Sequence, residues 1–319
     1  MKLVVMIPAF NEEATIGEAI DRIPRKIQGV DFVEVLVVDD GSRDKTSQIA
    51  KEHGAHLIFH EHNRGVGAAF STAVDGALKL QADIAVNMDA DLQFSPEDIP
   101  KLIQPILYDH VGFVTTSRFK DTAYVPVMPG VKLFGNKIVV WIINFITGKR
   151  FTDVSCGFRA FSKDTLLRLN LFGDFTYTQE TFIDLVQKRV TIREIPLRVR
   201  GVREYGKSRV ANNVLVYGVR SLIIMLRAMR DLKPLKFFGA IGVLLLGLGF
   251  FGGLFVFIHW LLVHKTTPFQ SLVNISGVLA ILGFLLLVLA LIADMMGRIK
   301  RIEEENLYYN KKTFYEKEK

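Results

Sequence analysis

The chain has 319 residues, half of them hydrophobic, and carries a formal net charge of +7 at pH 7. This length accommodates an ordinary globular domain and a further segment beside it. A single cysteine, Cys156, excludes an intrachain disulfide and fits a reducing compartment. No targeting segment is expected at the start, because residues 1–10 form only a short apolar run that continues into Asn-Glu-Glu.

The first two hundred residues alternate between short β-branched runs and stretches with helical spacing of apolar residues. Strands are predicted at 3–7, 33–38, 56–59, 84–87 and 112–116. Helices are predicted between them, for example at 14–27 and 65–80. This order favours an α/β fold with a mixed, mostly parallel sheet and helices on both faces.

A polar cluster follows each predicted strand. In chain order the clusters are Pro8-Ala9-Phe10-Asn11-Glu12-Glu13, Asp39-Asp40-Gly41-Ser42, Asn63-Arg64-Gly65-Val66-Gly67, Asp89-Ala90-Asp91-Leu92-Gln93 and Ser117-Arg118. Each cluster alone could be a turn or a helix cap. Because ligands bind outside the carboxyl ends of such strands, the five together predict a binding edge of the sheet.

The fourth cluster has the composition of a divalent-cation site. In an extended segment Asp89, Asp91 and Gln93 alternate onto one side of the chain. Mg²⁺ and Mn²⁺ take oxygen ligands, and Mg²⁺ is commonly held by one or two carboxylates and the phosphates of a substrate. The pattern therefore predicts a cation bound together with a diphosphate, and a simple turn is the alternative.

Two apolar runs, 237–263 and 272–292, follow the globular part. At a rise of about 1.5 Å per residue they reach roughly 40 and 30 Å, enough to cross a bilayer. The alternative is a pair of buried helices in a soluble core. The short link between the runs predicts a hairpin spanning residues 237–297, with the preceding domain and a charged tail at 298–319 on one side. Lys and Arg flank both runs, so the positive-inside rule places both termini in the cytoplasm of an integral membrane protein.

Basic charge gathers beside the first apolar run. Residues 185–236 contain thirteen Lys or Arg and three Asp or Glu. Such a cluster suits contact with the lipid bilayer or an anionic head group, and no nucleic-acid partner is expected, because aromatic residues do not interleave with the charges. Residues 210–236 are predicted to form amphipathic juxtamembrane helices. Residues 131–147, with Trp141, fit either an interfacial helix or a core helix.

The ordered motifs resemble the family 2 glycosyltransferases of the GT-A fold. Those that carry the likeness are Ile-Pro-Ala-Phe-Asn-Glu, Val-Asp-Asp-Gly-Ser, Asn-Arg-Gly-Val-Gly and Asp-Ala-Asp-Leu-Gln. Three later motifs, Asp153–Arg159, Gln179-Glu180 and Tyr205–Ser208, are similar to those of the polyisoprenyl-phosphate glycosyltransferases, which include dolichol-phosphate mannose synthases and bactoprenol glucosyltransferases. The resemblance covers about residues 1–230, and residues 1–209 would form the cytoplasmic catalytic domain.

The resemblance implies a role for each matching residue. Pro8, Phe10, Glu12 and Asp39 would line the nucleotide site, with Asp89 at the ribose or diphosphate. Asp91 and Gln93 would hold Mg²⁺ or Mn²⁺. The residues implied at the acceptor phosphate are Arg118, Ser155, Arg159 and Lys207. The catalytic set would be Asp89, Asp91, Arg118, Arg159 and Glu180. The chain departs from the common pattern at Phe10, where many relatives have Tyr, and at Cys156, where Ser or Gly is usual.

The reaction implied is an inverting transfer of a hexose, mannose or glucose first, from a nucleotide diphosphate sugar to dolichyl or undecaprenyl phosphate. Glu180 is expected to orient the acceptor loop or the sugar rather than act as a base; a favourable charge at a helix N-terminus is the alternative. A homo-oligomer is expected to be possible through Gly247, Gly249, Gly252 and Gly253, and a separate flippase is expected to move the product.

Two further hypotheses are a processive polysaccharide synthase and an inactive membrane-anchored scaffold. Against the synthase, the chain lacks the Gln-x-x-Arg-Trp motif that such enzymes usually carry. Against the scaffold, an inactive protein would not need to keep Asp89, Asp91 and Gln93.

Overall fold

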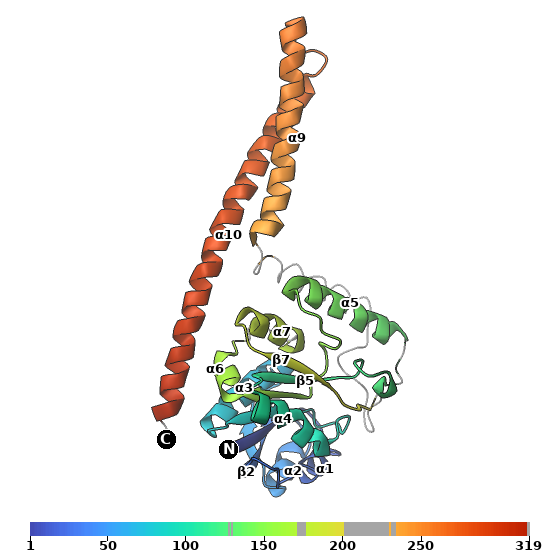
Figure 1. The fold of residues 1–319 in the computed structure, drawn as a ribbon, viewed down its shortest axis with the longest axis vertical. Coiled ribbons are helices and arrows are strands. Elements are labelled where there is room, and N and C mark those ends of the chain that lie inside the picture. The colour runs from blue at the N-terminus through green and yellow to red at the C-terminus, as the bar shows by residue number, and fades with distance from the viewer. Residues whose placement is uncertain (127, 129, 171–176, 201–229, 231–233, 318–319) are drawn as a thin grey trace. The chain divides into compact units, whose positions relative to one another are not determined.

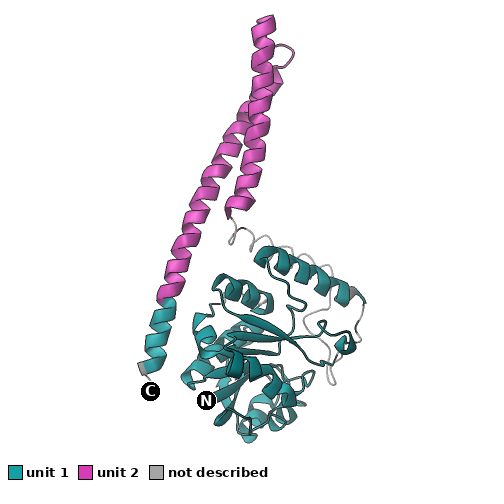
Figure 2. Cartoon of the chain, in the orientation of Figure 1, with its two compact units in different colours: residues 1–221, 307–319 teal, residues 222–306 magenta. Residues whose placement is uncertain are grey.

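The computed structural model describes the chain except residues 127, 129, 171–176, 201–229, 231–233 and 318–319. Two compact units are present, one made of residues 1–221 and 307–319 and one of residues 222–306 (Figure 2). Lys207 and most of the predicted juxtamembrane segment at 210–236 lie outside the described residues.

The first unit contains a seven-stranded sheet in the order β3-β2-β1-β4-β6-β5-β7 (Figure 1). Its strands are β1 (Lys2–Ala9), β2 (Phe32–Asp39), β3 (His56–Phe59), β4 (Ile84–Asn87), β5 (Phe113–Ser117), β6 (Arg159–Ser162) and β7 (Ile192–Pro196). β6 runs antiparallel to β4 and β5, and every other pair of neighbours is parallel. The prediction of a mixed, mostly parallel sheet is confirmed, although β6 and β7 were not among the predicted strands.

The carboxyl ends of β1 to β5 point to one edge of this sheet. Ala9 of β1 pairs with Asp39 of β2, which in turn pairs with Phe59 of β3, so these three strands end level. β4 is parallel to β1, and β5 has the direction of β4 because both oppose β6. The polar clusters after the five strands therefore share one edge, and the loop that leads into antiparallel β6 begins there too.

Helices connect the strands and cover the sheet. They are α1 (Ile16–Asp21), α2 (Thr46–Glu52), α3 (Val66–Lys79), α4 (Ile99–Asp109), α5 (Gly130–Thr147), α6 (Lys163–Arg168) and α7 (Tyr177–Gln187), with short 3₁₀ turns η1 (Pro96–Asp98) and η2 (Thr122–Tyr124). The helix predicted at 14–27 is shorter than expected. Pro24 disfavours helical backbone at the residue before it and offers no amide hydrogen, which explains the early end.

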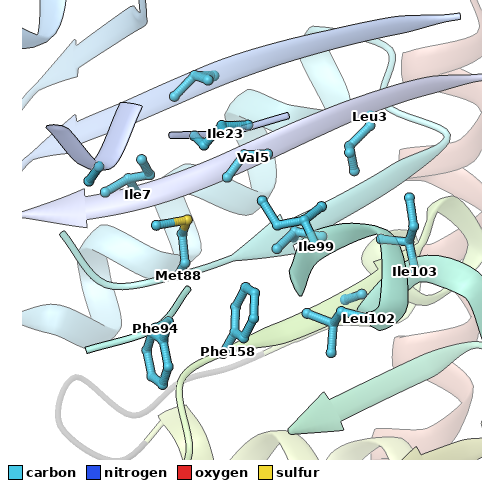
Figure 3. Close-up of a cluster of buried hydrophobic side chains, with 14 of the residues drawn as sticks. Leu3, Val5, Ile7, Ile23, Met88, Phe94, Ile99, Leu102, Ile103 and Phe158 are labelled. Carbon is cyan, nitrogen blue, oxygen red and sulfur yellow. The ribbon is translucent and has the colours of Figure 1, made fainter. Parts of the chain in front are cut away.

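The core lies against both faces of β1. Leu3, Val5 and Ile7 project into a cluster that includes Met88, Ile99, Leu102 and Phe158 (Figure 3). The intervening Val4 and Met6 are also fully buried. A strand buried on both faces is typical of a parallel sheet sandwiched between helices, and it leaves the strand ends as the place for polar chemistry.

The second unit is a pair of helices, α9 (Pro234–Val263) and most of α10 (Gln270–Lys317). Both helices are long and apolar enough to cross a membrane. α9 begins three residues before the predicted span. α10 has no break at residue 297, so the predicted charged tail continues the same helix to Lys317.

Small residues bring the backbones of α9 and α10 close together. A Cβ atom added to Gly249 would lie 2.7 Å from the carbonyl oxygen of Ser276, and one added to Gly283 would lie 2.8 Å from that of Gly242. Gly252 likewise faces Ser276, whereas Gly247 faces open space. Two of the four glycines that were expected to allow oligomer contacts are therefore used inside the hairpin.

The last turns of α10 pack on the first unit. The Tyr308 hydroxyl donates to Asp164 at 2.7 Å, and the Lys311 ammonium donates to the carbonyl oxygen of Leu169 at 3.0 Å. The side-chain amide of Gln81 donates to the carbonyl oxygen of Tyr315 at 2.8 Å. Residues 307–317 thus belong structurally to the sheet-containing unit.

Candidate active site

The segment after β4 forms a tight turn that holds its carboxylates in place. Leu92 has a φ of +57°, and Oδ1 of Asp91 accepts a hydrogen bond from the Gln93 amide at 3.1 Å. The expectation of an extended segment is therefore wrong, because the chain turns at Leu92. The predicted cation ligands Asp91 and Gln93 lie on either side of that residue. Asp91 is 2 % exposed, and a carboxylate buried to this degree needs compensating partners or a bound cation.

Gln93 connects this turn to the chain that follows β7. The side-chain amide nitrogen of Gln93 donates to the backbone carbonyl oxygen of Arg200 at 3.1 Å. The backbone carbonyl oxygen of Gln93 accepts from the backbone amide of Arg200 at 3.0 Å. Because the nitrogen is used here, Oε1 is the atom through which Gln93 would ligate a cation. The turn therefore lies beside the point where the chain enters the undescribed residues 201–229, which include Lys207.

The oxygen ligands of this turn suit a hard divalent cation that also binds the phosphates of the enzyme's substrate. Within the described ranges, no group of three or more His, Cys, Asp or Glu side chains is arranged to hold a metal ion. Asp91 and Gln93 offer only oxygen ligands, with Asp89 in the same turn. This small set fits Mg²⁺ or Mn²⁺ bound together with the oxygens of a diphosphate, rather than a closed all-protein site.

Asp89 lies directly against the loop that leads into β6. A Cβ atom added to Gly157 would lie 3.3 Å from Oδ1 and 3.2 Å from Oδ2 of Asp89. The side-chain amide of Asn87 donates to the Gly157 carbonyl oxygen at 2.9 Å and holds the loop at this distance. The fourth strand's cluster and the 153–157 loop thus meet at a glycine.

Tyr177 lies behind Asp89 and was not predicted. Its side chain is buried, hydrogen-bonds Asn87 and stacks on Phe70 with ring centroids 4.5 Å apart. Burial raises the pKa of the Tyr177 phenol above its ordinary value, and the charge of Asp89 raises it further. The phenol therefore stays protonated and can act as a hydrogen-bond donor beside Asp89.

A fully buried carboxylate, Asp153, fixes the guanidinium of Arg118. Nε of Arg118 donates to Oδ2 of Asp153 at 2.6 Å, and a terminal nitrogen donates to Oδ1 at 2.9 Å. The same terminal nitrogen donates to Oγ of Ser155 at 2.7 Å, and this hydroxyl donates to Oδ1 of Asn136 on α5 at 2.6 Å. The structure thus brings Arg118 and Ser155 together, as the sequence predicted, and adds Asp153 and Asn136 as their supports.

Arg159 differs from Arg118 and Ser155 in being completely buried. Its side chain is fully buried, and its guanidinium donates to the carbonyl oxygens of Cys156, Thr178 and Val154 at 2.7, 2.9 and 3.1 Å. It also lies over the ring of Phe182, 5.1 Å from the centroid. This placement contradicts a direct contact between Arg159 and an acceptor phosphate, because the first residue of β6 points into the interior. Arg159 supports the 154–156 loop instead.

Glu194 on β7 holds the start of the same loop. Its carboxylate accepts hydrogen bonds from the amides of Thr152 and Asp153 at 2.8 and 2.9 Å. Desolvation by burial raises the pKa of Glu194 above its ordinary value, although the bonds from the loop oppose the shift. Burial also raises the pKa of the Cys156 thiol to about 12. Side chains from β4, β5, β6, β7 and α5 therefore all fix this one loop.

The predicted nucleotide residues lie at the ends of β1 and β2. Pro8 pairs with Val38 in the register of these strands. Asp39 is buried, and its carboxylate accepts from the Ser42 amide at 2.9 Å and from the Ser47 hydroxyl. The backbone amide of Glu12 donates to the Thr46 hydroxyl at 2.9 Å, which ties the two strand exits together.

Two further predicted residues, Phe10 and Glu180, lie at the start of a loop and of a helix. Phe10 follows the last residue of β1 and is half-buried. Glu180 lies in the first turn of α7, where a negative charge is favourable to the helix, and it too is half-buried. Neither position contradicts the predicted role.

Helix α5 has one buried face and one exposed apolar face. Val139, Ile142, Ile143 and Ile146 are buried against the unit. Phe134, Trp141 and Phe145 lie on the other side and are 66, 65 and 60 % exposed. The sequence left open whether this segment is a core helix or an interfacial helix. The structure shows one face buried in the core and one exposed apolar face of the kind an interfacial helix has. Asn136 connects the same helix to Ser155.

Comparison with known proteins agrees with this geometry. Residues 4–168 match the family model described as glycosyl transferase family 2. The chain is 32 % identical over 245 residues to a UDP-N-acetylglucosamine–dolichyl-phosphate N-acetylglucosaminyltransferase from Methanococcus voltae, covering 70 % of this chain and 96 % of the relative. It is 28 % identical to an undecaprenyl-phosphate 4-deoxy-4-formamido-L-arabinose transferase from Sodalis glossinidius, covering 93 % of this chain and 89 % of the relative.

A solved structure shares the fold. Glucosyl-3-phosphoglycerate synthase from Mycobacterium tuberculosis, in complex with Mn²⁺, uridine diphosphate and phosphoglyceric acid, aligns with a TM-score of 0.54 and 24 % identity. The alignment covers 72 % of this chain and 77 % of the synthase.

Proposed function

The chain belongs to glycosyl transferase family 2, and we propose that it transfers a hexose from a nucleotide diphosphate sugar to a polyisoprenyl phosphate with inversion at the anomeric carbon. The two relatives above act on dolichyl phosphate and undecaprenyl phosphate, by their names. The observation that carries the proposal is the contact between Asp89 and Gly157. Asp89 belongs to the turn after β4 that contains the predicted cation ligands, and Gly157 belongs to the 153–157 loop, whose Asp153 holds Arg118. In this proposal the contact would join the donor diphosphate site to the acceptor phosphate site.

The donor end is formed by the exits of β1, β2 and β4. Pro8, Glu12 and Asp39 would bind the nucleotide, and Asp89 would lie at the ribose or diphosphate. Asp91 and Gln93 would hold Mg²⁺ or Mn²⁺, which when bound neutralises charge on the departing diphosphate. In the Mn²⁺ complex of the fold relative, the same architecture binds uridine diphosphate.

At the acceptor end, the reaction needs a positively charged side chain more than it needs a general base. A phosphate monoester has a second pKa near 6, so its oxygen is already largely anionic at neutral pH and can attack the anomeric carbon directly. An arginine both binds and orients such an oxygen. Arg118 would supply this group, with its plane fixed by Asp153, and Ser155 and Lys207 would assist. Glu180 would orient the acceptor loop or the sugar.

The lipid part of the acceptor explains the apolar surfaces of the chain. α9 and α10 would span the membrane as a hairpin, with the catalytic unit and both termini in the cytoplasm. The exposed face of α5, with Phe134, Trp141 and Phe145, would meet the bilayer, since aromatic side chains favour the interface. Two spans are few for a path across the membrane, so a separate protein would move the glycolipid to the other leaflet.

A donor panel tests the proposed reaction. The full chain, in detergent or in vesicles, is incubated with GDP-mannose, UDP-glucose or UDP-N-acetylglucosamine and with undecaprenyl or dolichyl phosphate, with and without a chelator. We expect one donor to give a sugar phosphate lipid whose formation stops with the chelator and returns with Mg²⁺ or Mn²⁺. Lack of lipid product with every donor would contradict the proposal and favour a scaffold role.

A further inference from the structure

A buried pair of polar residues, Asp40 and His60, lies beside the predicted nucleotide site but has no role in the mechanism above. Asp40 directly follows β2 and His60 directly follows β3. Nδ1 of His60 and Oδ1 of Asp40 are 2.7 Å apart, and the two residues are 6 and 3 % exposed. Burying such groups is costly unless their hydrogen bonds are made. Their other partners therefore indicate what the pair is for.

These partners all lie in or beside the loop that enters α3. The Asp40 carboxylate accepts from the backbone amide of Arg64 at 2.9 Å and from that of Gly65 at 2.8 Å. Nε2 of His60 lies 3.0 Å from the Thr72 hydroxyl on α3. Because Asp40 is an acceptor, Nδ1 of His60 carries the hydrogen of their bond, and Nε2 pairs with the Thr72 hydroxyl. The pair thus ties β2 and β3 to the 62–65 loop.

This arrangement changes the interpretation of the glycine-rich motif Asn63–Gly67. Glycine-rich loops before a helix commonly bind phosphate through their free amides. Here the last two amides before α3, those of Arg64 and Gly65, already donate to the Asp40 carboxylate. A second anion at these amides would meet the charge of Asp40. At these two positions the loop is therefore fixed by Asp40 and is not free to bind a diphosphate.

The 62–65 loop contacts the turn at Gly41 that follows Asp39. Gly41 has a φ of +76°, and a Cβ atom added there would lie 2.7 Å from the carbonyl carbon of His62 and 2.8 Å from the amide nitrogen of Asn63. The backbones of the loop and the turn are thus in direct contact. The turn also orders the Asp39 carboxylate through Ser42, whose amide is 2.9 Å away. A shift of the loop would move this turn and the Asp39 side chain with it.

We propose that His60 and Asp40 are positioning residues for donor recognition: they fix the 62–65 loop against the Gly41 turn and so preform the site at which Asp39 meets the nucleotide. The inference rests on the proposed function, because it takes Asp39 as a nucleotide contact. It assigns the pair an effect on donor affinity and none on the chemical step.

Two substitutions at one position and one on its partner test this. His60→Ala removes the bond to Asp40, His60→Asn keeps an N–H donor near it, and Thr72→Val removes the bond to α3. His56→Ala is the matched control, since His56 lies on the same strand and its side chain is 52 % exposed. Each full-length variant is compared by thermal melting, by its Kd for UDP and for GDP with Mn²⁺, and by KM and kcat.

Loss of one buried hydrogen bond corresponds to about a tenfold change in an equilibrium constant. We expect His60→Ala to raise the nucleotide Kd and the donor KM about tenfold, with kcat and the KM for the lipid phosphate within about twofold. His60→Asn should recover most of the loss, Thr72→Val should show a smaller increase, and His56→Ala should match the parent protein.

The outcomes separate this inference from the proposed function. A His60→Ala protein that melts at a lower temperature but binds the nucleotide like the parent would show a purely structural pair and overturn the inference. So would a fall in kcat at unchanged donor KM. If the parent binds UDP or GDP but forms no glycolipid, the proposed reaction fails, and the Kd comparison still decides the role of His60. If the parent binds neither nucleotide, both proposals are overturned.

Discussion

Asp153 holds Arg118 in a two-point contact, with nitrogen–oxygen distances of 2.6 and 2.9 Å, and Asp153 itself is completely buried. A carboxylate in this position neutralises the arginine and fixes the plane of its guanidinium. Such a pair is expensive to break, since removal of one partner leaves a buried charge without compensation. It makes Asp153 the support of the proposed acceptor arginine.

The first prediction concerns this pair. We expect Asp153→Asn to lower kcat/KM for the lipid phosphate by about 10- to 100-fold, because the amide keeps the shape but loses the charge that orients Arg118. The Kd for the nucleotide should stay unchanged. Steady-state kinetics with varied lipid phosphate, together with nucleotide titration, measure the two effects. An equal loss in nucleotide affinity would show that Asp153 supports the whole fold rather than the acceptor end.

The second prediction concerns the contact between Asp89 and the β6 loop. Gly157→Ala would place a methyl group 3.2 to 3.3 Å from both Asp89 oxygens, so the carboxylate or the loop must shift. We expect kcat to fall by at least about tenfold, since small displacements of catalytic groups are costly. Gly130→Ala is the control, because nothing lies within 4 Å of its added Cβ. Equal rates for both variants would mean that the Asp89 position does not matter to the reaction.

The third prediction concerns the pH dependence contributed by Glu194. Its pKa in the folded protein is raised above the ordinary value of 4.5, so the folded state binds this proton more tightly than the unfolded state. The stabilisation from this group is therefore complete below about pH 4.5 and is lost as the pH rises through the folded pKa. Glu194→Gln should gain stability relative to the parent protein over that pH interval.

Chemical denaturation between pH 4 and 8 measures this effect. Glu194→Ala serves as the comparison, because it also removes the acceptor of the Thr152 and Asp153 amides and should be less stable than Glu194→Gln by about 1.5 to 3 kcal/mol at every pH. A constant difference between Glu194→Gln and the parent across the interval would contradict the assigned direction of the pKa.

The fourth prediction concerns the single thiol. Cys156 is 2 % exposed and burial raises its pKa to about 12, whereas the thiolate is the reactive form. We expect no alkylation by iodoacetamide at pH 8 in the native protein and complete alkylation in denaturant, with mass spectrometry as the readout. Rapid labelling of the native protein would mean that the 153–157 loop opens in solution.

The sequence predicted the elements that follow simple hydrophobic patterns. β1 to β5 and the two long helices were identified because β-branched runs and unbroken apolar stretches signal them directly. β6 was missed because its four residues begin with an arginine, and a motif does not record that its guanidinium is buried on the carbonyl oxygens of Val154, Cys156 and Thr178. β7 was missed because its five residues, Ile-Arg-Glu-Ile-Pro, contain two consecutive charged residues and a proline and show no strand-like alternation.

For the candidate site, the sequence predicted which residues lie at one edge of the sheet, and their roles stay predictions. Motif order identified Asp89, Asp91, Gln93, Arg118 and Ser155, which share one edge of the sheet. It placed Arg159 at the phosphate, although burial over the Phe182 ring contradicts this, and it gave no signal for Asn136 or Glu194. Side chains that support others from distant strands are fixed by tertiary packing, which a short motif does not record.

The most direct test of the account is product analysis with Asp91→Ala beside the parent protein. Membranes carrying each chain are given the donor identified in the panel and undecaprenyl phosphate, and the lipid extract is analysed by mass spectrometry. We expect a sugar phosphate lipid from the parent and less than about one hundredth of it from Asp91→Ala, since loss of such an electrostatic contact costs about 10²-fold or more. Product from Asp91→Ala at the parental rate would contradict it.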